Sequence, residues 1–155
     1  MSKYVKQFPD IFISGEPEES LKNGASKIVS LIKPSWKTED FRFKIFTDGI
    51  SNKLIGVYVE NVGKAEMVLV RVYGAKTELI IDRNAEIRNM TVLNEVGCGC
   101  ELYAQFGNGL AYEFLPGTNT HNFFQILYSS TTSLGLKNSS FRLRFLIKFL
   151  LILFI

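Results

Sequence analysis

The sequence has few of the residues that form disulfide frameworks and metal centres. Its 155 residues include two cysteines, Cys98 and Cys100, and one histidine, His121. Two cysteines separated by one glycine form a poor disulfide, and a metal site needs more ligands than these three residues offer. We therefore expect no metal site, and we expect both cysteines to be small residues at a helix end in a reducing compartment.

The sequence also lacks a strong excess of charge of either sign. Its 18 basic and 15 acidic residues give a net charge of +3. The densest basic cluster consists of Arg142, Arg144 and Lys148, which lie within an apolar segment. A nucleic-acid-binding surface usually has a larger and more continuous basic patch. We therefore predict that nucleic acid is not a partner.

Apolar runs long enough to span a bilayer are also missing. Residues 1–12 contain charges and a proline but no apolar signal-peptide core, which favours a cytoplasmic protein. Residues 141–155 are apolar but include three cations, and they fall short of the ~20 residues that a spanning helix needs. This segment is compatible with weak association with a membrane surface.

The rest of the composition is typical of a folded domain, with 46% hydrophobic and 13% aromatic residues. A helix is predicted between Pro17 and Pro34, since proline suits a first helical turn and ends a helix that reaches it. Its apolar positions recur at three- and four-residue spacing. They are Leu21, Ala25, Ile28, Val29 and Ile32.

From residue 41 the apolar residues alternate with polar ones, which predicts strands and hairpins. The expected strands are residues 41–45, 54–60, 67–73, 101–106 and 110–114, with a helix over residues 82–96 before the last two. Asn108-Gly109 is a strong signal for a tight hairpin turn. The predicted fold is α+β: an antiparallel five-stranded sheet with one packed helix, preceded by another helix.

This order of elements could hold a nucleotide. The turn at residues 48–52 offers backbone amides for phosphates, and Arg71 on the third strand offers a lasting positive charge. Glu86, on the following helix, is placed to hold Arg71, and the backbone of residues 112–115 is placed to meet adenine. Each feature alone is more often structural, as a plain hairpin or a weak surface salt bridge. Their order is what favours nucleotide binding.

The sequence resembles the choline/ethanolamine kinase family over about residues 25–117, or around three-fifths of the chain. The Thr-Asp-Gly-Ile form of the turn and the Lys-Thr-Glu segment are more similar to ethanolamine kinases than to choline kinases. The segments that carry the resemblance are 46–54 (FTDGISNKL), 68–74 (VLVRVYG), 76–78 (KTE), 82–83 (DR) and 108–114 (NGLAYEF).

The resemblance implies the N-terminal lobe of a protein-kinase-like fold and ATP-dependent phosphorylation of ethanolamine, the first step toward phosphatidylethanolamine. It implies ATP as cofactor, with Mg²⁺ by family, and ethanolamine as substrate. The residues that it assigns to ATP are Gly49, Ser51 and Asn52 over the phosphates, Arg71 paired with Glu86, and Glu113 to Leu115 beside the adenine.

The resemblance stops after Gly117. The family continues into a helical lobe with a His-x-Asp-x-x-x-x-Asn catalytic loop and a second acidic motif for magnesium. This sequence has no aspartate after Arg83 and no acidic residue after Glu113. We therefore predict no catalytic residue and no metal ligand here, and little or no turnover by the chain alone.

Three divisions of the chain follow: a segment with a helix at 1–40, the ATP-binding half at 41–117, and a polar linker with an apolar tail at 118–155. We favour a truncated form of an ethanolamine kinase, whose tail derives from an alternative exon, a retained intron or a truncated gene model. The alternative is a non-catalytic isoform that binds nucleotide, a partner chain as a dimer, or a membrane. A third interpretation is an unstable product with an exposed lobe surface.

Overall fold

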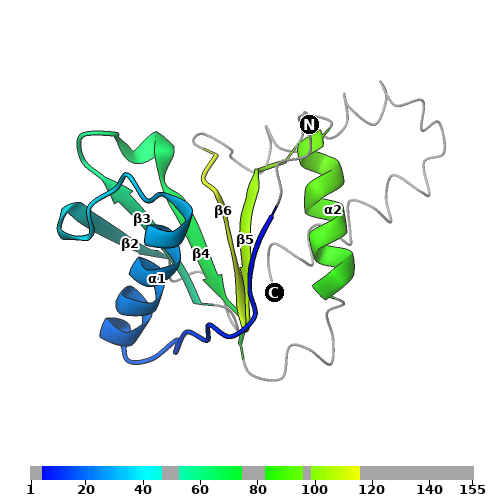
Figure 1. The fold of residues 1–155 in the computed structure, drawn as a ribbon, viewed down its shortest axis with the longest axis horizontal. Helices are drawn as coiled ribbons and strands as arrows, with labels where there is room; N and C mark the ends of the chain where they lie inside the picture. The colour runs from blue at the N-terminus through cyan, green and yellow to red at the C-terminus, as the bar shows by residue number, and fades with distance from the viewer. Residues whose placement is uncertain (1–4, 47–52, 75–82, 96–98, 116–155) are drawn as a thin grey trace.

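The described residues form a six-stranded sheet with one helix on each face (Figure 1). The computed structural model describes residues 5–46, 53–74, 83–95 and 99–115. The elements in chain order are β1 (Lys6–Phe8), α1 (Glu18–Ile32), a 3-10 turn (Thr38–Asp40), β2 (Phe41–Phe46), β3 (Lys53–Val59), a second 3-10 turn (Lys64–Glu66), β4 (Val68–Val72), α2 (Arg83–Glu95), β5 (Leu102–Phe106) and β6 (Gly109–Glu113).

The strand order is β1-β5-β6-β4-β3-β2. The α+β class and the five expected strands are present, but the prediction of a five-stranded antiparallel sheet was wrong. Residues 6–8 add a sixth strand, β1, which pairs with β5 in parallel and makes the sheet mixed. The apolar residues Val5, Phe8, Ile11 and Ile13 are compatible with a short extended segment that Pro9 limits, but so short a pattern does not predict a strand of this sheet. The strand covers backbone groups that would otherwise leave β5 as an open edge.

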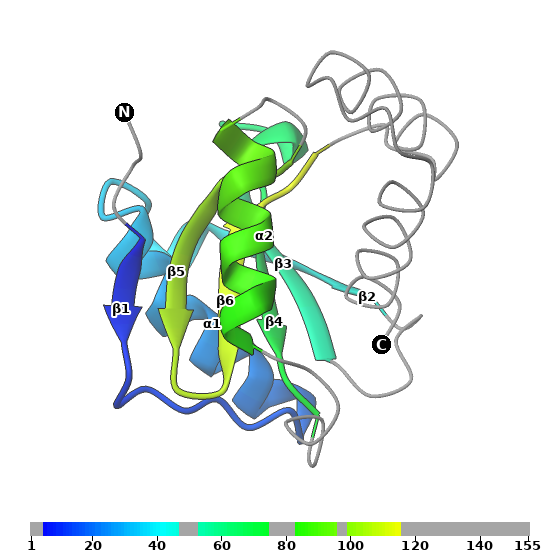
Figure 2. The same ribbon diagram turned by 90° about the vertical axis from the view of Figure 1, so that its right-hand side faces the viewer.

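The prediction of one packed helix was also wrong, because both helices pack on the sheet. Figure 2 shows α2 in front of the sheet and α1 behind it. The α1 side buries an entirely hydrophobic cluster in which the odd residues of β3 and the even residues of β4 meet the helix. Its buried members are Ile13, Leu21, Ala25, Ile28, Val29, Phe41, Ile55, Val57, Val59, Val68, Val70, Val72, Ala104, Phe106 and Ala111.

The opposite side of the sheet has a smaller apolar cluster beneath α2. Its buried members are Met90, Leu102, Leu110 and Tyr112. The helix runs almost as predicted, and its buried residues are Glu86, Met90 and Leu93, spaced along one helical face. A glutamate thus occupies a position that the apolar pattern alone would not assign to the interior.

Two turns fix the hairpins. Between β3 and β4, the amide of Gly63 donates to the carbonyl of Val59 at 3.0 Å, and Gly63 has a φ of 91°, which favours glycine. Between β5 and β6, a Cβ at Gly109 would collide with the Phe106 ring and the Arg71 carbonyl. The second turn lies at the predicted Asn108-Gly109 pair, and the first lies between the strands expected at 54–60 and 67–73.

The second turn also holds the N-terminal part of the chain. The side chain of Asn108 accepts a hydrogen bond from the Ile13 amide at 2.9 Å and donates one to the Ile13 carbonyl at 2.8 Å. The Asn108 amide therefore pairs with Ile13 as a neighbouring strand would, over a sequence separation of 95 residues. The predicted segment 1–40 contributes β1, α1 and Ile13 to the same sheet and core as residues 41–115.

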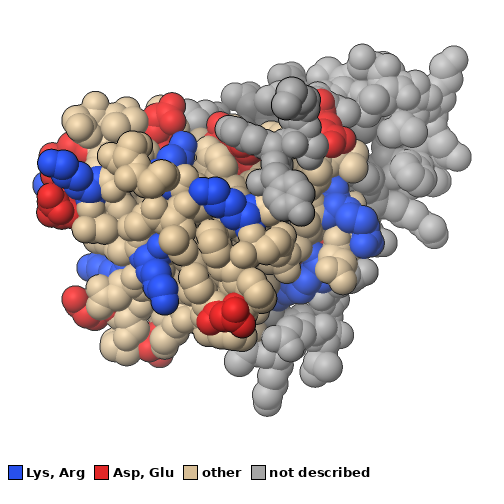
Figure 3. All heavy atoms as spheres, viewed as in Figure 1, with Lys and Arg blue, Asp and Glu red and all other residues tan. Residues whose placement is uncertain are grey.

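Several sequence predictions lie outside the described residues. They concern the turn at 48–52 and all of 118–155. They also concern three expectations from local residue types: an extended piece at the apolar residues 79–81, a helix N-cap at Asp82 and a C-terminal glycine at Gly97. Within the described part of the chain, no helix is both long and apolar enough to cross a membrane. A lone aromatic residue such as Trp36 is more often a packing residue than a binding residue, and Trp36 packs edge-on against Phe41 with ring centroids 6.5 Å apart. On the face in Figure 3, basic and acidic side chains of the described residues are interspersed.

Candidate functional site

Arg71 lies in the middle of the sheet, on the face that carries α2. Alternation along β4 directs Val70 and Val72 toward α1, so Arg71 faces the other side. In the strand register Arg71 stands between Leu54 of β3 and Leu110 of β6. Its side chain is only 7% exposed, so the apolar stem is covered while the guanidinium must find polar partners.

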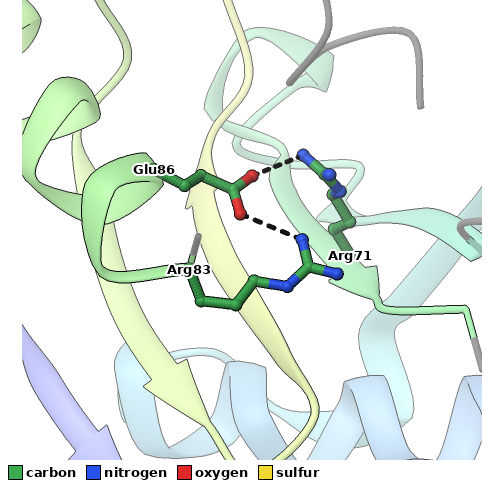
Figure 4. A network of polar contacts seen from close by, with 3 residues as sticks. All are labelled: Arg71, Arg83 and Glu86. Atoms are coloured by element: carbon green, nitrogen blue, oxygen red, sulfur yellow. Dashed lines mark hydrogen bonds and ion pairs between the residues drawn. The ribbon is translucent and has the colours of Figure 1, made fainter. Parts of the chain in front are cut away.

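Glu86 provides one such partner from the first turn of α2. Arg71 Nη1 donates to Glu86 Oε1 at 2.9 Å, and the Glu86 side chain is fully buried (Figure 4). The ion pair that the sequence predicted is thus present, and it joins the central strand β4 to α2. The structural alternative for this pair was a weak salt bridge at the surface. A charged hydrogen bond between buried groups is stronger than such an exposed salt bridge.

A second arginine completes this group, and the sequence analysis gave it no role. Arg83 Nη1 donates to Glu86 Oε2 at 3.1 Å, so each carboxylate oxygen binds a different arginine (Figure 4). We call Arg71, Glu86 and Arg83 the ion cluster. The three-residue spacing of Arg83 and Glu86 on one helix is a signal that could have revealed the contact. Together the three side chains carry one net positive charge, because arginine stays protonated.

Tyr73 lies beneath the ion cluster. It follows Arg71 by two residues on the same face, and the Arg83 guanidinium centre lies 3.5 Å from the Tyr73 ring centroid. The Tyr73 hydroxyl is buried and has no hydrogen-bond partner in the described structure. Burial, and then the negative charge of Glu86, raises the pKa of Tyr73 well above its usual value. Tyr73 is therefore a neutral aromatic surface on which Arg83 stacks.

Two half-buried leucines share this face of the sheet with Arg71. Leu54 is the register partner of Arg71 on β3, and Leu69 precedes Arg71 by two residues on β4. Both pack against the smaller apolar cluster. The sequence analysis gave them no binding role, although the period of two along each strand places them beside Arg71. They provide an apolar surface next to a cation.

The predicted adenine segment lies at the end of β6, which is the strand next to β4. Glu113 N–H donates to the Glu101 carbonyl at 2.9 Å, and Phe114 N–H donates to the Met67 carbonyl at 3.1 Å. Glu113 Oε2 accepts from Glu101 N–H at 3.0 Å, so this carboxylate fixes the ends of β5 and β6. A nucleobase beside Leu115 would therefore bind to carbonyls of this segment or to backbone beyond Phe114.

The remaining predicted site residues, Gly49, Ser51 and Asn52, lie outside the described residues. The described ranges also contain no group of three or more His, Cys, Asp or Glu side chains arranged to hold a metal ion. The ion cluster fits an anionic ligand, since arginine provides planar donors for phosphate. Of the predicted ATP residues, the structure thus joins Arg71 to Glu86 and places Glu113 and Leu115 at the end of the adjacent strand.

Comparisons with known proteins find relatives named ethanolamine kinases. The chain is 42% identical to human ethanolamine kinase 1 over 108 residues, which are 70% of this chain and 24% of that protein. It is 47% identical to human ethanolamine kinase 2 over 105 residues, or 68% of this chain and 27% of that protein. The chain therefore spans about a quarter of the length of these curated relatives.

A solved structure gives the same result for the fold. The Plasmodium vivax ethanolamine kinase superimposes with a TM-score of 0.56 at 28% identity, covering 74% of this chain and 29% of that chain. The sheet and helices thus form a protein-kinase-like N-terminal lobe. The sequence profile described as Choline/ethanolamine kinase matches residues 43–127, more than half of the chain. This chain belongs to the choline/ethanolamine kinase family.

Proposed function

We propose that this chain provides the ATP-binding part of an ethanolamine kinase, an enzyme that transfers a phosphoryl group from ATP to ethanolamine. The observation that carries the proposal is the buried Arg71–Glu86 pair, which joins the central strand to α2. Phosphoryl transfer depends mainly on positioning and on neutralising phosphate charge, and a fixed arginine does both. The relatives named ethanolamine kinases support ethanolamine as the acceptor.

In this proposal the described residues bind ATP at three places. Arg71 contacts the phosphates, Leu54 and Leu69 pack against the base, and residues 113–115 offer backbone groups to its edge. Gly49, Ser51 and Asn52 complete the phosphate contacts. ATP supplies the phosphoryl group, and Mg²⁺ would neutralise its charge. The donor set among the described residues does not fit Mg²⁺.

The proposal predicts ATP binding without turnover by these 155 residues, because no acidic residue follows Glu113. The test combines calorimetric titration with ATP and a phosphotransfer assay with ATP, Mg²⁺ and ethanolamine or choline. Arg71→Ala should abolish ATP binding, while Arg88→Ala, which changes an exposed arginine of α2, should leave it unchanged. Ethanolamine phosphorylation that Arg71→Ala abolishes would show that our prediction of an inactive chain is wrong. A folded chain that does not bind ATP would overturn the proposal.

The other partners stay predictions. Membrane association through residues 141–155 concerns a segment outside the described residues, and the dimer and the cytoplasmic location have no test among the described contacts. A flotation assay with vesicles of neutral and anionic lipid would test the first of these. Membrane binding that is lost when residues 141–155 are removed would favour the non-catalytic alternative.

A further inference from the structure

We propose that Arg83 is a positioning residue: by holding one oxygen of Glu86, it sets the orientation in which Arg71 meets the phosphates of ATP. The inference rests on the proposed function and deepens it. It starts from the division of the Glu86 carboxylate, in which Oε1 binds Arg71 at 2.9 Å and Oε2 binds Arg83 at 3.1 Å. Arg83 thus binds the same carboxylate as Arg71, although the predicted pair consisted of Arg71 and Glu86 alone.

The geometry of guanidinium and carboxylate groups explains why the second arginine matters. An arginine facing a carboxylate alone tends to bind both oxygens with two parallel N–H groups. With Arg83 on Oε2, Glu86 takes one nitrogen of Arg71 instead of two. Arginine has five N–H donors, so this single contact is compatible with simultaneous contacts to phosphate. Arg83 therefore prevents Arg71 from binding both oxygens of Glu86 at once.

Arg83 is itself held in place. Its side chain is 15% exposed, and its guanidinium stacks on Tyr73, with the centre 3.5 Å from the ring centroid. Tyr73 lies on the same face as Arg71, two residues further along the chain, so the sheet orients both partners of Glu86. Lysine would keep the charge of Arg83 but would lose the planar stack and the fixed direction of the donor.

Two other roles for Arg83 predict different results. An arginine that contacts phosphate directly would weaken ATP binding independently of Arg71. An arginine that only anchors α2 would change stability and affect every ligand equally. A positioning residue acts through Arg71, so the effects of changing the two residues should not add.

The first measurement is a double-mutant cycle on ATP affinity with Arg71→Gln, Arg83→Gln and the double variant. We expect Arg83→Gln to weaken ATP binding about tenfold, and to have no further effect when Arg71 is already changed. Adenosine affinity should stay constant, and the matched control Arg88→Gln should resemble the unchanged chain. Additive losses, or an equal loss of adenosine binding, would overturn the proposal. If Arg83→Gln does not fold, Arg83→Lys takes its place in the cycle.

The second measurement does not depend on ATP. A crystal structure of the Arg83→Gln chain, or of Arg83→Lys, should show Arg71 bound to both oxygens of Glu86. An unchanged single contact from Nη1 to Oε1 would overturn the positioning role, whether or not ATP binds. A third outcome separates the two proposals. If the unaltered chain does not bind ATP, but Arg71 binds both oxygens of Glu86 in the variant, the proposed function is overturned and the geometric role of Arg83 is supported.

Discussion

The two faces of the sheet bury different chemistry. The buried hydrophobic cluster on the α1 side has fifteen members, whereas the cluster beneath α2 has four and lies beside the buried Arg71 and Glu86. Apolar burial stabilises a fold directly, but a buried ion pair often contributes no more than apolar residues of the same volume. The α1 face therefore provides most of the apolar burial that holds the lobe together, while the α2 face buries charged groups, for which we propose an anionic ligand.

The largest effect should come from the α1 face. Phe106 is 2% exposed and is among the largest fully buried side chains. Phe106→Ala should lower the free energy of unfolding by about 3–5 kcal/mol, because it removes apolar contacts and leaves a cavity. The control is Phe12→Ala, at a side chain that is 70% exposed, and urea denaturation measures both. Similar losses for the two variants would show that this face does not form the main core.

A somewhat smaller loss should follow when the ion cluster is broken. Glu86→Ala leaves Arg71 and Arg83 with an uncompensated charge in a buried site, which should cost about 3 kcal/mol of unfolding free energy. Glu95→Ala, at an exposed position of the same helix, is the control and should change stability by less than about 0.5 kcal/mol. Equal stability of the two variants would mean that the cluster is not a coupled unit.

The α2 face should also respond to alkaline pH. Burial raises the pKa values of Tyr73 and Tyr112 above their usual range, so both phenols ionise more readily in the unfolded chain. This contribution to stability is complete below pH ~10 and is lost as the pH rises. Each tyrosine should lower the free energy of unfolding by about 1 kcal/mol between pH 10 and 11. Urea denaturation at several pH values should show that the unfolding free energy of Tyr73→Phe falls less steeply with pH than that of the unaltered chain. The same pH dependence in both proteins would contradict the role given to Tyr73.

The smallest change in stability should come from replacing the whole ion cluster. Arg71→Met, Glu86→Leu and Arg83→Met together should leave the unfolding free energy within about 1 kcal/mol, or raise it, because apolar groups fill a buried site well. The same triple variant should lose ATP binding completely. If it were as unstable as Glu86→Ala, the cluster would contribute net stability, and the contrast between the two faces would disappear.

Periodicity and turn chemistry predicted most of the fold. The helices and five strands lie within one or two residues of their expected places, since alternation and three- to four-residue spacing directly reflect which side is buried. A short extended segment near β1 is compatible with the apolar residues there, but its pairing could not be predicted, because its partner β5 lies almost a hundred residues away. Pairing of this kind depends on the assembled sheet and leaves no local pattern.

The candidate site was only partly predictable. The order of elements suggested Arg71 and Glu86, but no sequence pattern showed that Glu86 would be fully buried. Arg83 was missed because an arginine at the start of a helix usually faces solvent, and its three-residue spacing from Glu86 is a weak signal beside the bond and the stack on Tyr73 that the structure shows. Leu54 and Leu69 were treated as ordinary strand residues, since their closeness to Arg71 depends on the register of β3 with β4.

The link between Asn108 and Ile13 has a consequence for synthesis on the ribosome. The Ile13 backbone receives its partner only after 95 further residues have been made. At about 5–20 residues per second, this is a wait of roughly 5–20 s, during which the first strand has no sheet to join. The emerging lobe therefore presents its N-terminal apolar residues to chaperones before its last hairpin closes the sheet.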